Sequence, residues 1–89
     1  MQLNMSELQE QILRTIVRYA ADGRTVRSPD ICLMMPEIVP LDVVAATVET
    51  LVPPGYLRKV SPVAYRLNLN NAVVVELLRE LSEIGDYTK

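Results

Sequence analysis

The chain has 89 residues, of which 49% are hydrophobic and 22% are charged, and its formal net charge is −2 at pH 7. This length predicts one small domain, residues 1–89, which buries only about 60 to 65% of its unfolded surface and is often helped by a partner. No apolar run approaches the ~20 residues that span a bilayer, and the amino terminus has no signal-type apolar core. We therefore expect a cytoplasmic protein that does not enter a membrane.

The chain lacks the residue types on which many catalytic and metal sites depend. It contains no histidine and a single cysteine, Cys32, which excludes an internal disulfide and a cysteine/histidine metal site. A serine or cysteine nucleophile would have no imidazole base, and the carboxylates form no paired motif. We expect no enzymatic activity, no metal and no cofactor. Expected burial also argues against a redox role for Cys32.

The first expected helix covers residues 6–22. Ser6 and Gln9 have the spacing of a capping box, in which the hydroxyl accepts a hydrogen bond from the backbone amide three residues on. Apolar residues then recur at intervals of three and four and form one face that packs on the core. The residues of that face are Leu8, Ile12, Leu13, Ile16, Val17 and Ala20.

A short strand at residues 25–27 and a helix at residues 29–35 are expected next. Ser28 has the chemistry of a helix cap, and the following proline and aspartate are typical of a first helical turn. The residues after Asp30 are mostly apolar, so we expect this helix, including Cys32, to be nearly enclosed by the core.

The third expected helix covers residues 41–52 and stops at Pro53, because proline has no amide hydrogen to donate. Val44, Val48 and Leu51 recur at helical spacing and are expected to face inward. Residues 56–69 then predict a β-hairpin in which apolar and polar positions alternate. The alternation lets the cations project while Leu57, Tyr65 or Leu67 pack inward. The hairpin cations are Arg58, Lys59 and Arg66.

Helix, Pro-Pro-Gly break and hairpin together resemble the recognition helix and wing of winged helix-turn-helix transcription regulators. The matching wing residues are Gly55, Tyr56, Leu57, Arg58, Tyr65 and Leu67. The resemblance implies a mainly α fold with a small β-sheet (α+β), built as a three-helix core, a β-hairpin wing and a C-terminal helix. It also implies that the strand near Val26 completes a three-stranded sheet and that the partner is double-stranded DNA. The turn at 37–40 is longer and more apolar than is usual in a helix-turn-helix.

The last expected helix covers residues 72–84 and has an apolar stripe opposite a charged side. In winged-helix regulators a helix after the wing commonly pairs with its twin, so the resemblance implies a homodimer. The alternative is that the helix only covers its own core. The candidate dimerisation residues are Val74, Leu77, Leu78, Leu81 and Ile84.

Charge is unevenly distributed along the chain. Residues 28–54 carry four acidic side chains and no basic one, whereas residues 55–69 carry three basic side chains and no acidic one. For DNA binding, the resemblance implies that the hairpin contacts phosphates and that the third helix reads bases. The candidate phosphate contacts are Arg58, Lys59, Arg66, Arg24 and Arg27, and the weak base-facing candidates are Thr47 and Thr50.

Two functions follow from this sequence. The first is a small winged-helix DNA-binding protein, a dimeric transcription regulator. The second is a winged-helix protein-protein interaction module that does not bind DNA, which the acidic third helix favours because acids oppose phosphate.

Overall fold

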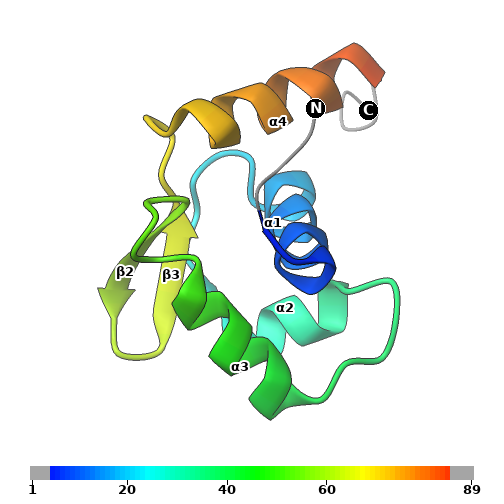
Figure 1. Ribbon diagram of the computed structural model, residues 1–89, viewed down its shortest axis with the longest axis vertical. Coiled ribbons are helices and arrows are strands. Elements are labelled where there is room, and N and C mark those ends of the chain that lie inside the picture. The colour runs from blue at the N-terminus through cyan, green and yellow to red at the C-terminus, as the bar shows by residue number, and fades with distance from the viewer. Residues whose placement is uncertain (1–4, 85–89) are drawn as a thin grey trace.

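The computed structural model describes residues 5–84 and shows a mixed α+β fold, with four helices and a small three-stranded antiparallel sheet in that range. The elements lie in the order that the sequence predicts (Figure 1). They are α1 (Glu7–Tyr19), β1 (Val26–Arg27), α2 (Ser28–Met34), α3 (Leu41–Thr50), β2 (Leu57–Ser61), β3 (Ala64–Leu67) and α4 (Ala72–Ile84).

Helix α1 begins with the predicted capping box, since the Ser6 hydroxyl accepts from the Gln9 backbone at 3.1 Å and the Gln9 side chain accepts from the Ser6 backbone at 2.8 Å. The helix ends at Tyr19, earlier than the predicted boundary at residue 22. The reason is that Ala20 leaves the helical region, with φ −136° and ψ 39°. Gly23 then turns the chain at φ 84°, a value that favours glycine.

Helix α2 differs from the prediction at its start and in its burial. Arg27, and not Ser28, occupies the capping position, and the Asp30 carboxylate accepts from the Arg27 backbone N–H at 3.1 Å. Ile31 is buried, but Leu33 is 87% exposed and Cys32 is only half-buried. The expectation of near-enclosure was wrong because a two-turn helix contacts the core along one side only.

Helix α3 ends at Thr50, two residues before the predicted boundary, and Leu51 closes a tighter turn by donating its N–H to the Val48 carbonyl at 3.0 Å. Pro53 and Pro54 have no amide hydrogens to donate to the carbonyls of Glu49 and Thr50, and the ring of Pro53 disfavours helical backbone at Val52, so the helical hydrogen bonding stops here. As predicted, Val44, Val48 and Leu51 face inward and are fully buried.

The sheet has the strand order β1-β3-β2, so the two-residue strand β1 completes it as the sequence predicts. Arg27 pairs with Ala64, and Arg58 pairs with Arg66. The register shifts between Lys59 and Ser61, which places an irregularity near the hairpin tip. This shift twists the end of the edge strand β2.

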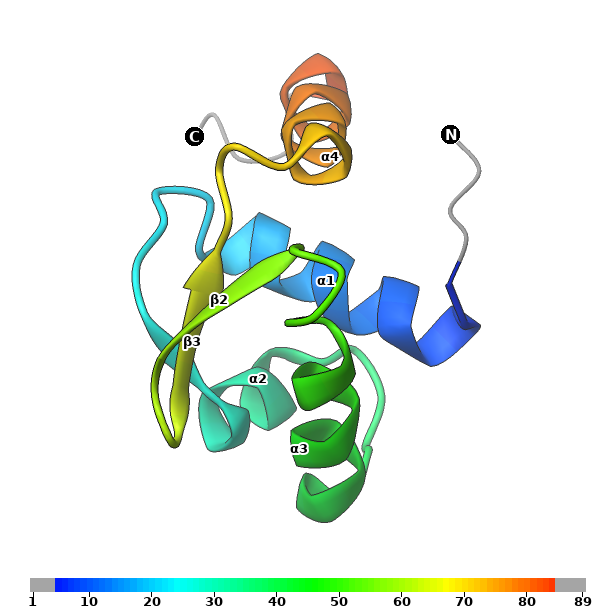
Figure 2. The same ribbon diagram turned by 60° about the vertical axis from the view of Figure 1, so that its left-hand side comes forward.

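Helix α1 lies through the middle of the molecule, with α4 across one side of it and α2 and α3 on the other (Figures 1 and 2). The hairpin closes the remaining side beside α3. One buried cluster joins all of these elements, with Ile12 and Leu13 from α1, Ile31 from α2 and Val74 from α4 among its members. Over residues 5–84, no helix has the length and apolar character needed to cross a membrane.

Candidate interaction surface

The outer face of α3 is apolar and acidic. Its exposed side chains include Leu41, Asp42, Val43 and Glu49, and the helix contains no lysine or arginine. A helix that reads the major groove normally presents Arg, Lys, Asn or Gln. This face therefore lacks the groups that direct readout uses most.

The two threonines expected to face bases are engaged within the chain. The Thr47 hydroxyl donates to the Val43 carbonyl at 2.7 Å, and the Thr50 hydroxyl donates to the Thr47 carbonyl at 2.5 Å. Thr50 Oγ1 also accepts from Gln9 Nε2 at 2.9 Å, which ties α3 to the start of α1. Because both hydroxyl protons are donated to backbone carbonyls, neither threonine side chain has a hydrogen-bond donor left for a DNA base.

Lys59 does not project into solvent as a free cation. Its Nζ lies 2.7 Å from Glu49 Oε2, and the Tyr65 hydroxyl donates to that same oxygen. Nζ also lies 5.9 Å from the centre of the Tyr65 ring, within the range of a cation–π contact. The positive charge nearest to α3 is therefore neutralised by α3 itself.

Contacts among Lys59, Glu49 and Tyr65 shift the pKa values of two of these residues. Hydrogen bonds from Lys59 and then from Tyr65 lower the pKa of Glu49 below its ordinary value of 4.5. Burial, followed by the hydrogen bond to Glu49, raises the pKa of Tyr65 to about 12. Both shifts favour the state in which Glu49 is ionised and Tyr65 keeps its proton, which is the state that the hydrogen bonds require.

Arg58 and Arg66 lie on the other face of the sheet. They are directly opposite each other in the β2–β3 pair, and strand alternation places them on the side away from Lys59 and Tyr65. Both are exposed, and within residues 5–84 neither forms an ion pair. They line a small cavity of about 200 Å³ beside Asp22.

The remaining expected phosphate contacts are also dispersed. Arg24 pairs with Asp22 at 3.3 Å, so its charge is partly compensated. Arg27 lies at the junction of β1 and α2, beside the hairpin tip. Lys59 and the Arg58–Arg66 pair thus lie on opposite faces of the sheet, and Arg24 lies in the loop before β1. The five predicted cations therefore do not form one positive surface with α3.

An apolar groove, which we call the α3–hairpin groove, lies between the start of α2, the outer side of α3 and the hairpin tip. Its volume is about 330 Å³. Its lining residues are Arg27, Ser28, Pro29, Leu41, Ala45, Glu49, Pro62, Val63 and Tyr65. Sequence reasoning missed this groove because residues 56–69 were interpreted only as a hairpin, and the approach of Pro62 and Val63 to α3 depends on tertiary packing.

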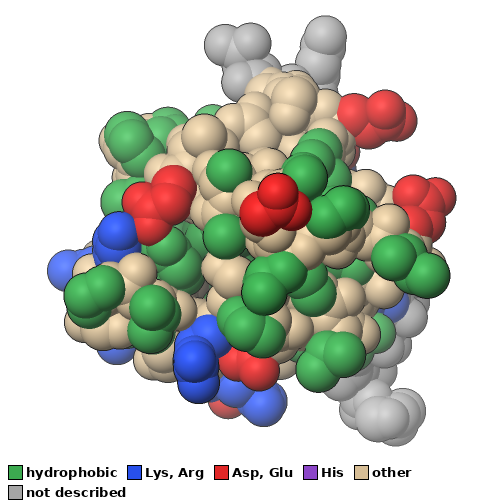
Figure 3. Space-filling model, turned by 90° about the horizontal axis from the view of Figure 1, so that it is seen from below, with side chains coloured by type: hydrophobic (Ala, Val, Ile, Leu, Met, Phe, Trp, Pro, Cys, Tyr) green, Lys and Arg blue, Asp and Glu red, His purple; other side chains and the backbone are tan. Residues whose placement is uncertain are grey.

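Exposed apolar side chains concentrate on the same side of the molecule. Of the nine large apolar side chains exposed within residues 5–84, six belong to α2, the α2–α3 loop, α3 and the hairpin: Leu33, Ile38, Leu41, Val43, Val60 and Val63. Figure 3, seen from the α2–α3 end, shows hydrophobic side chains spread over this face, with an acidic side chain among them. Lys and Arg lie toward its left and lower margins, and further acidic side chains lie at the margins as well. The pattern is typical of a surface that another macromolecule covers.

No protein-family model, curated protein or solved structure matched this chain.

Most of the expected dimerisation stripe is already covered by the chain's own core. Val74, Leu77 and Leu81 are buried in the cluster that includes α1, so they are not available to a second copy. Leu78 is half-buried, and the side chain of Ile84 lies outside the described residues. These positions match the alternative that α4 covers its own core.

Polar contacts also join α4 to α1. The Arg14 guanidinium lies 2.8 Å from the Glu10 carboxylate and 3.4 Å from the Glu80 carboxylate. These contacts, with the hydrogen bond to Glu10 as the main cause, raise the pKa of Arg14. Helix α4 is therefore held to α1 by buried leucines and by a bridging arginine.

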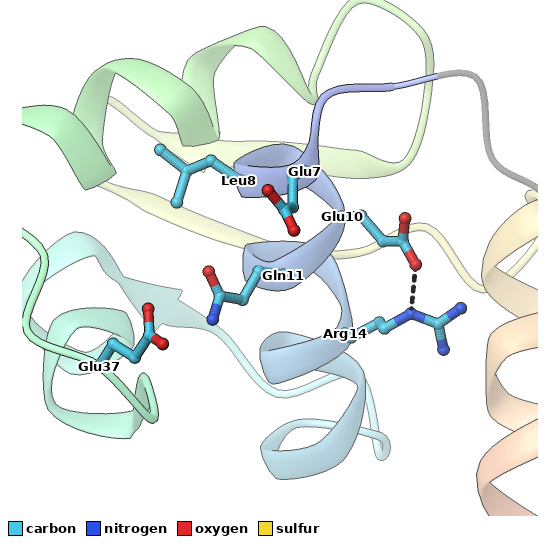
Figure 4. A pocket seen from close by; sticks show the side chains of 6 residues that line it. All are labelled: Glu7, Leu8, Glu10, Gln11, Arg14 and Glu37. Carbon is cyan, nitrogen blue, oxygen red and sulfur yellow. Dashed lines mark hydrogen bonds and ion pairs between the residues drawn. The ribbon is translucent and has the colours of Figure 1, made fainter.

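A wide acidic hollow of about 630 Å³ lies at the start of α1 (Figure 4). From α1 it is lined by Glu7, Leu8, Glu10, Gln11 and Arg14, of which Arg14 pairs with Glu10, and Glu37 lines it from the α2–α3 loop. Within residues 5–84, no group of three or more acidic or cysteine side chains is placed to hold a metal ion. The hollow adds negative potential beside the exposed α2–α3 loop.

Proposed function

We propose that this chain is a protein-interaction module with a winged-helix arrangement, and that it binds its partner through the surface of α2, α3 and the hairpin tip. The observation that carries the proposal is the outer face of α3, where apolar and acidic side chains are exposed and no cation is present. Phosphate neutralisation supplies most of the non-specific affinity for DNA. A recognition helix with this face would repel the phosphates that flank a major groove.

The distribution of the hairpin cations supports the same proposal. Lys59, the hairpin cation that faces α3, is bound to Glu49, whereas Arg58 and Arg66 lie on the opposite face of the sheet. DNA binding by a helix and wing together is favoured when their cations form one positive surface along the phosphates. The charges here are separated by the sheet.

A second candidate is DNA-backbone binding by the hairpin of a dimeric regulator. The observation that favours it is the exposed pair of Arg58 and Arg66, which face each other without an acidic partner among residues 5–84. Two adjacent cations attract a polyanion. In this candidate the contacts would be to phosphate and would carry little sequence information.

The deciding experiment is fluorescence anisotropy with labelled random-sequence duplex DNA at a low and a high salt concentration, together with sedimentation of the same sample. The interaction-module proposal predicts no binding near physiological salt. Binding that weakens steeply with salt, and that the Arg58→Ala/Arg66→Ala variant weakens at every sequence, would replace it with the second candidate. A Lys59→Ala variant provides the control, because Lys59 faces α3.

A further inference from the structure

The α3–hairpin groove presents an apolar opening in which the Glu49 carboxylate is already satisfied. Leu41 and Val63 stand on opposite walls and are both at least half exposed. The Glu49 carboxylate accepts from Lys59 and Tyr65, so this polar end of the groove is internally bonded. An apolar side chain placed in the groove would gain contact with both walls.

The edges of this groove carry uncompensated negative charge. Asp30 follows the lining residue Pro29, and Asp42 follows the lining residue Leu41. Both are exposed, and within residues 5–84 neither has an ion-pair partner. Each carboxylate accepts a hydrogen bond from a nearby backbone N–H, at 3.1 Å for Asp30 and 3.0 Å for Asp42, which leaves the charge itself unneutralised.

Arg27 is the one cation that lines the groove, and its backbone is held by Asp30. Lys59 adjoins the groove but is paired with the lining residue Glu49. Two exposed acids, Asp30 and Asp42, each follow a lining residue in the sequence, and Glu37 lies farther along on the α2–α3 loop. No other basic residue lies between positions 28 and 54. The rim is therefore net acidic, and it favours a partner with basic side chains beside its apolar ones.

From these observations, and resting on the interaction function proposed above, we propose that the α3–hairpin groove binds a basic segment of a partner protein. One apolar side chain of that segment occupies the groove between Leu41 and Val63, and flanking lysines or arginines pair with Asp30 and Asp42. The apolar anchor supplies affinity, and the flanking charges set the orientation and the rate of association.

Three synthetic peptides of equal length test this proposal by NMR titration of the 15N-labelled chain. The first carries a central leucine pair flanked by lysines, the second replaces the leucines with serine, and the third replaces the lysines with glutamate. We expect the first peptide to bind most tightly and to shift the backbone amides of the groove lining. If the three peptides bind equally, or if none binds, the proposal is wrong.

A matched pair of valine variants locates the binding site. Val63 at the groove is 57% exposed and Val75 on α4 is 47% exposed, so both tolerate a polar replacement without loss of the core. Val63→Lys should weaken binding of the leucine–lysine peptide at least about tenfold, because a buried apolar contact is lost and a positive charge that repels the peptide's lysines enters the groove. Val75→Lys should leave the affinity unchanged.

The charge contribution is tested by Asp42→Lys. This variant should lose affinity for the leucine–lysine peptide and gain affinity for the leucine–glutamate peptide. Peptide-induced shifts centred on Leu33 and Ile38 would overturn the groove assignment and leave the interaction function intact. The DNA titration described above tests that function separately, so the two failures are distinguishable.

Discussion

The Lys59 ammonium lies 2.7 Å from the Glu49 carboxylate, and this contact joins the edge strand of the hairpin to the last turn of α3. The Tyr65 hydroxyl donates to the same carboxylate from the central strand. One acidic side chain on α3 thus holds two strands. It also sets the separation of α3 from the hairpin, on which the width of the α3–hairpin groove depends.

Glu49→Gln should change how the unfolding free energy depends on pH. The pKa of Glu49 is lowered on folding, so its contribution to stability is present above its ordinary value of 4.5 and is lost as pH falls through the folded value. The wild type should therefore lose more unfolding free energy than Glu49→Gln below about pH 4.5. Urea unfolding at several pH values measures this difference. Glu37→Gln, an exposed substitution without an ion pair within residues 5–84, should behave like the wild type.

Ionisation of the Tyr65 hydroxyl should lower the unfolding free energy at high pH. Its pKa is raised to about 12 in the folded chain from an ordinary value of 10.0, so its contribution is fully present below pH 10 and is lost as pH rises through 12. Ultraviolet absorbance of tyrosinate, recorded for the wild type and for Tyr65→Phe, isolates this group by difference. A difference titration centred near pH 10 would show that burial and Glu49 do not act on the hydroxyl as described.

Truncation of a buried leucine at the end of α3 and of an exposed leucine on α2 tests how α3 contributes to the core. Leu51 is fully buried at the end of α3, so Leu51→Ala should lower the unfolding free energy by about 2 to 5 kcal/mol. Leu33 is exposed on α2, and Leu33→Ala should change stability by no more than about 0.5 kcal/mol. Urea unfolding of both variants gives the comparison. Equal effects would contradict the burial of Leu51.

Leu77→Ala distinguishes the two roles considered for α4. Because Leu77 is buried within its own chain, the truncation should lower the unfolding free energy by about 2 to 5 kcal/mol. Sedimentation should give the same molecular mass for the variant and the wild type under conditions where both are folded. A wild-type dimer that dissociates in the variant, with monomer stability retained, would restore α4 as a dimerisation helix.

Local patterns in the sequence predicted the elements well. The capping box at Ser6 and the inward positions Val44, Val48 and Leu51 follow from spacing along one helix, and the structure confirms them. The closing of the sheet near Val26 was also predicted. These features depend on neighbours within a few residues, or on a strand pairing that the resemblance implied.

Features that depend on distant contacts were not predictable in the same way. The apolar stripe of α4 indicates a buried face, but the pattern does not say whether α1 or a second chain covers it. The ion pair between Lys59 and Glu49 likewise depends on tertiary structure. Helical periodicity placed Glu49 on the third helix and strand alternation placed Lys59 on the hairpin, and neither pattern indicates that the two side chains meet. One signal was available and was missed: adjacent residues of a strand point to opposite faces, so Arg58 and Lys59 could not share one DNA-facing surface.

The two-residue strand β1 has a consequence for folding kinetics. It pairs Val26 with Tyr65, which lie 39 positions apart in the sequence. So short a strand has few hydrogen bonds with which to offset the entropy of closing that loop. We expect the helices and the β2–β3 hairpin to form first and β1 to dock last, so that hydrogen exchange in β1 reports the earliest local opening of the native molecule.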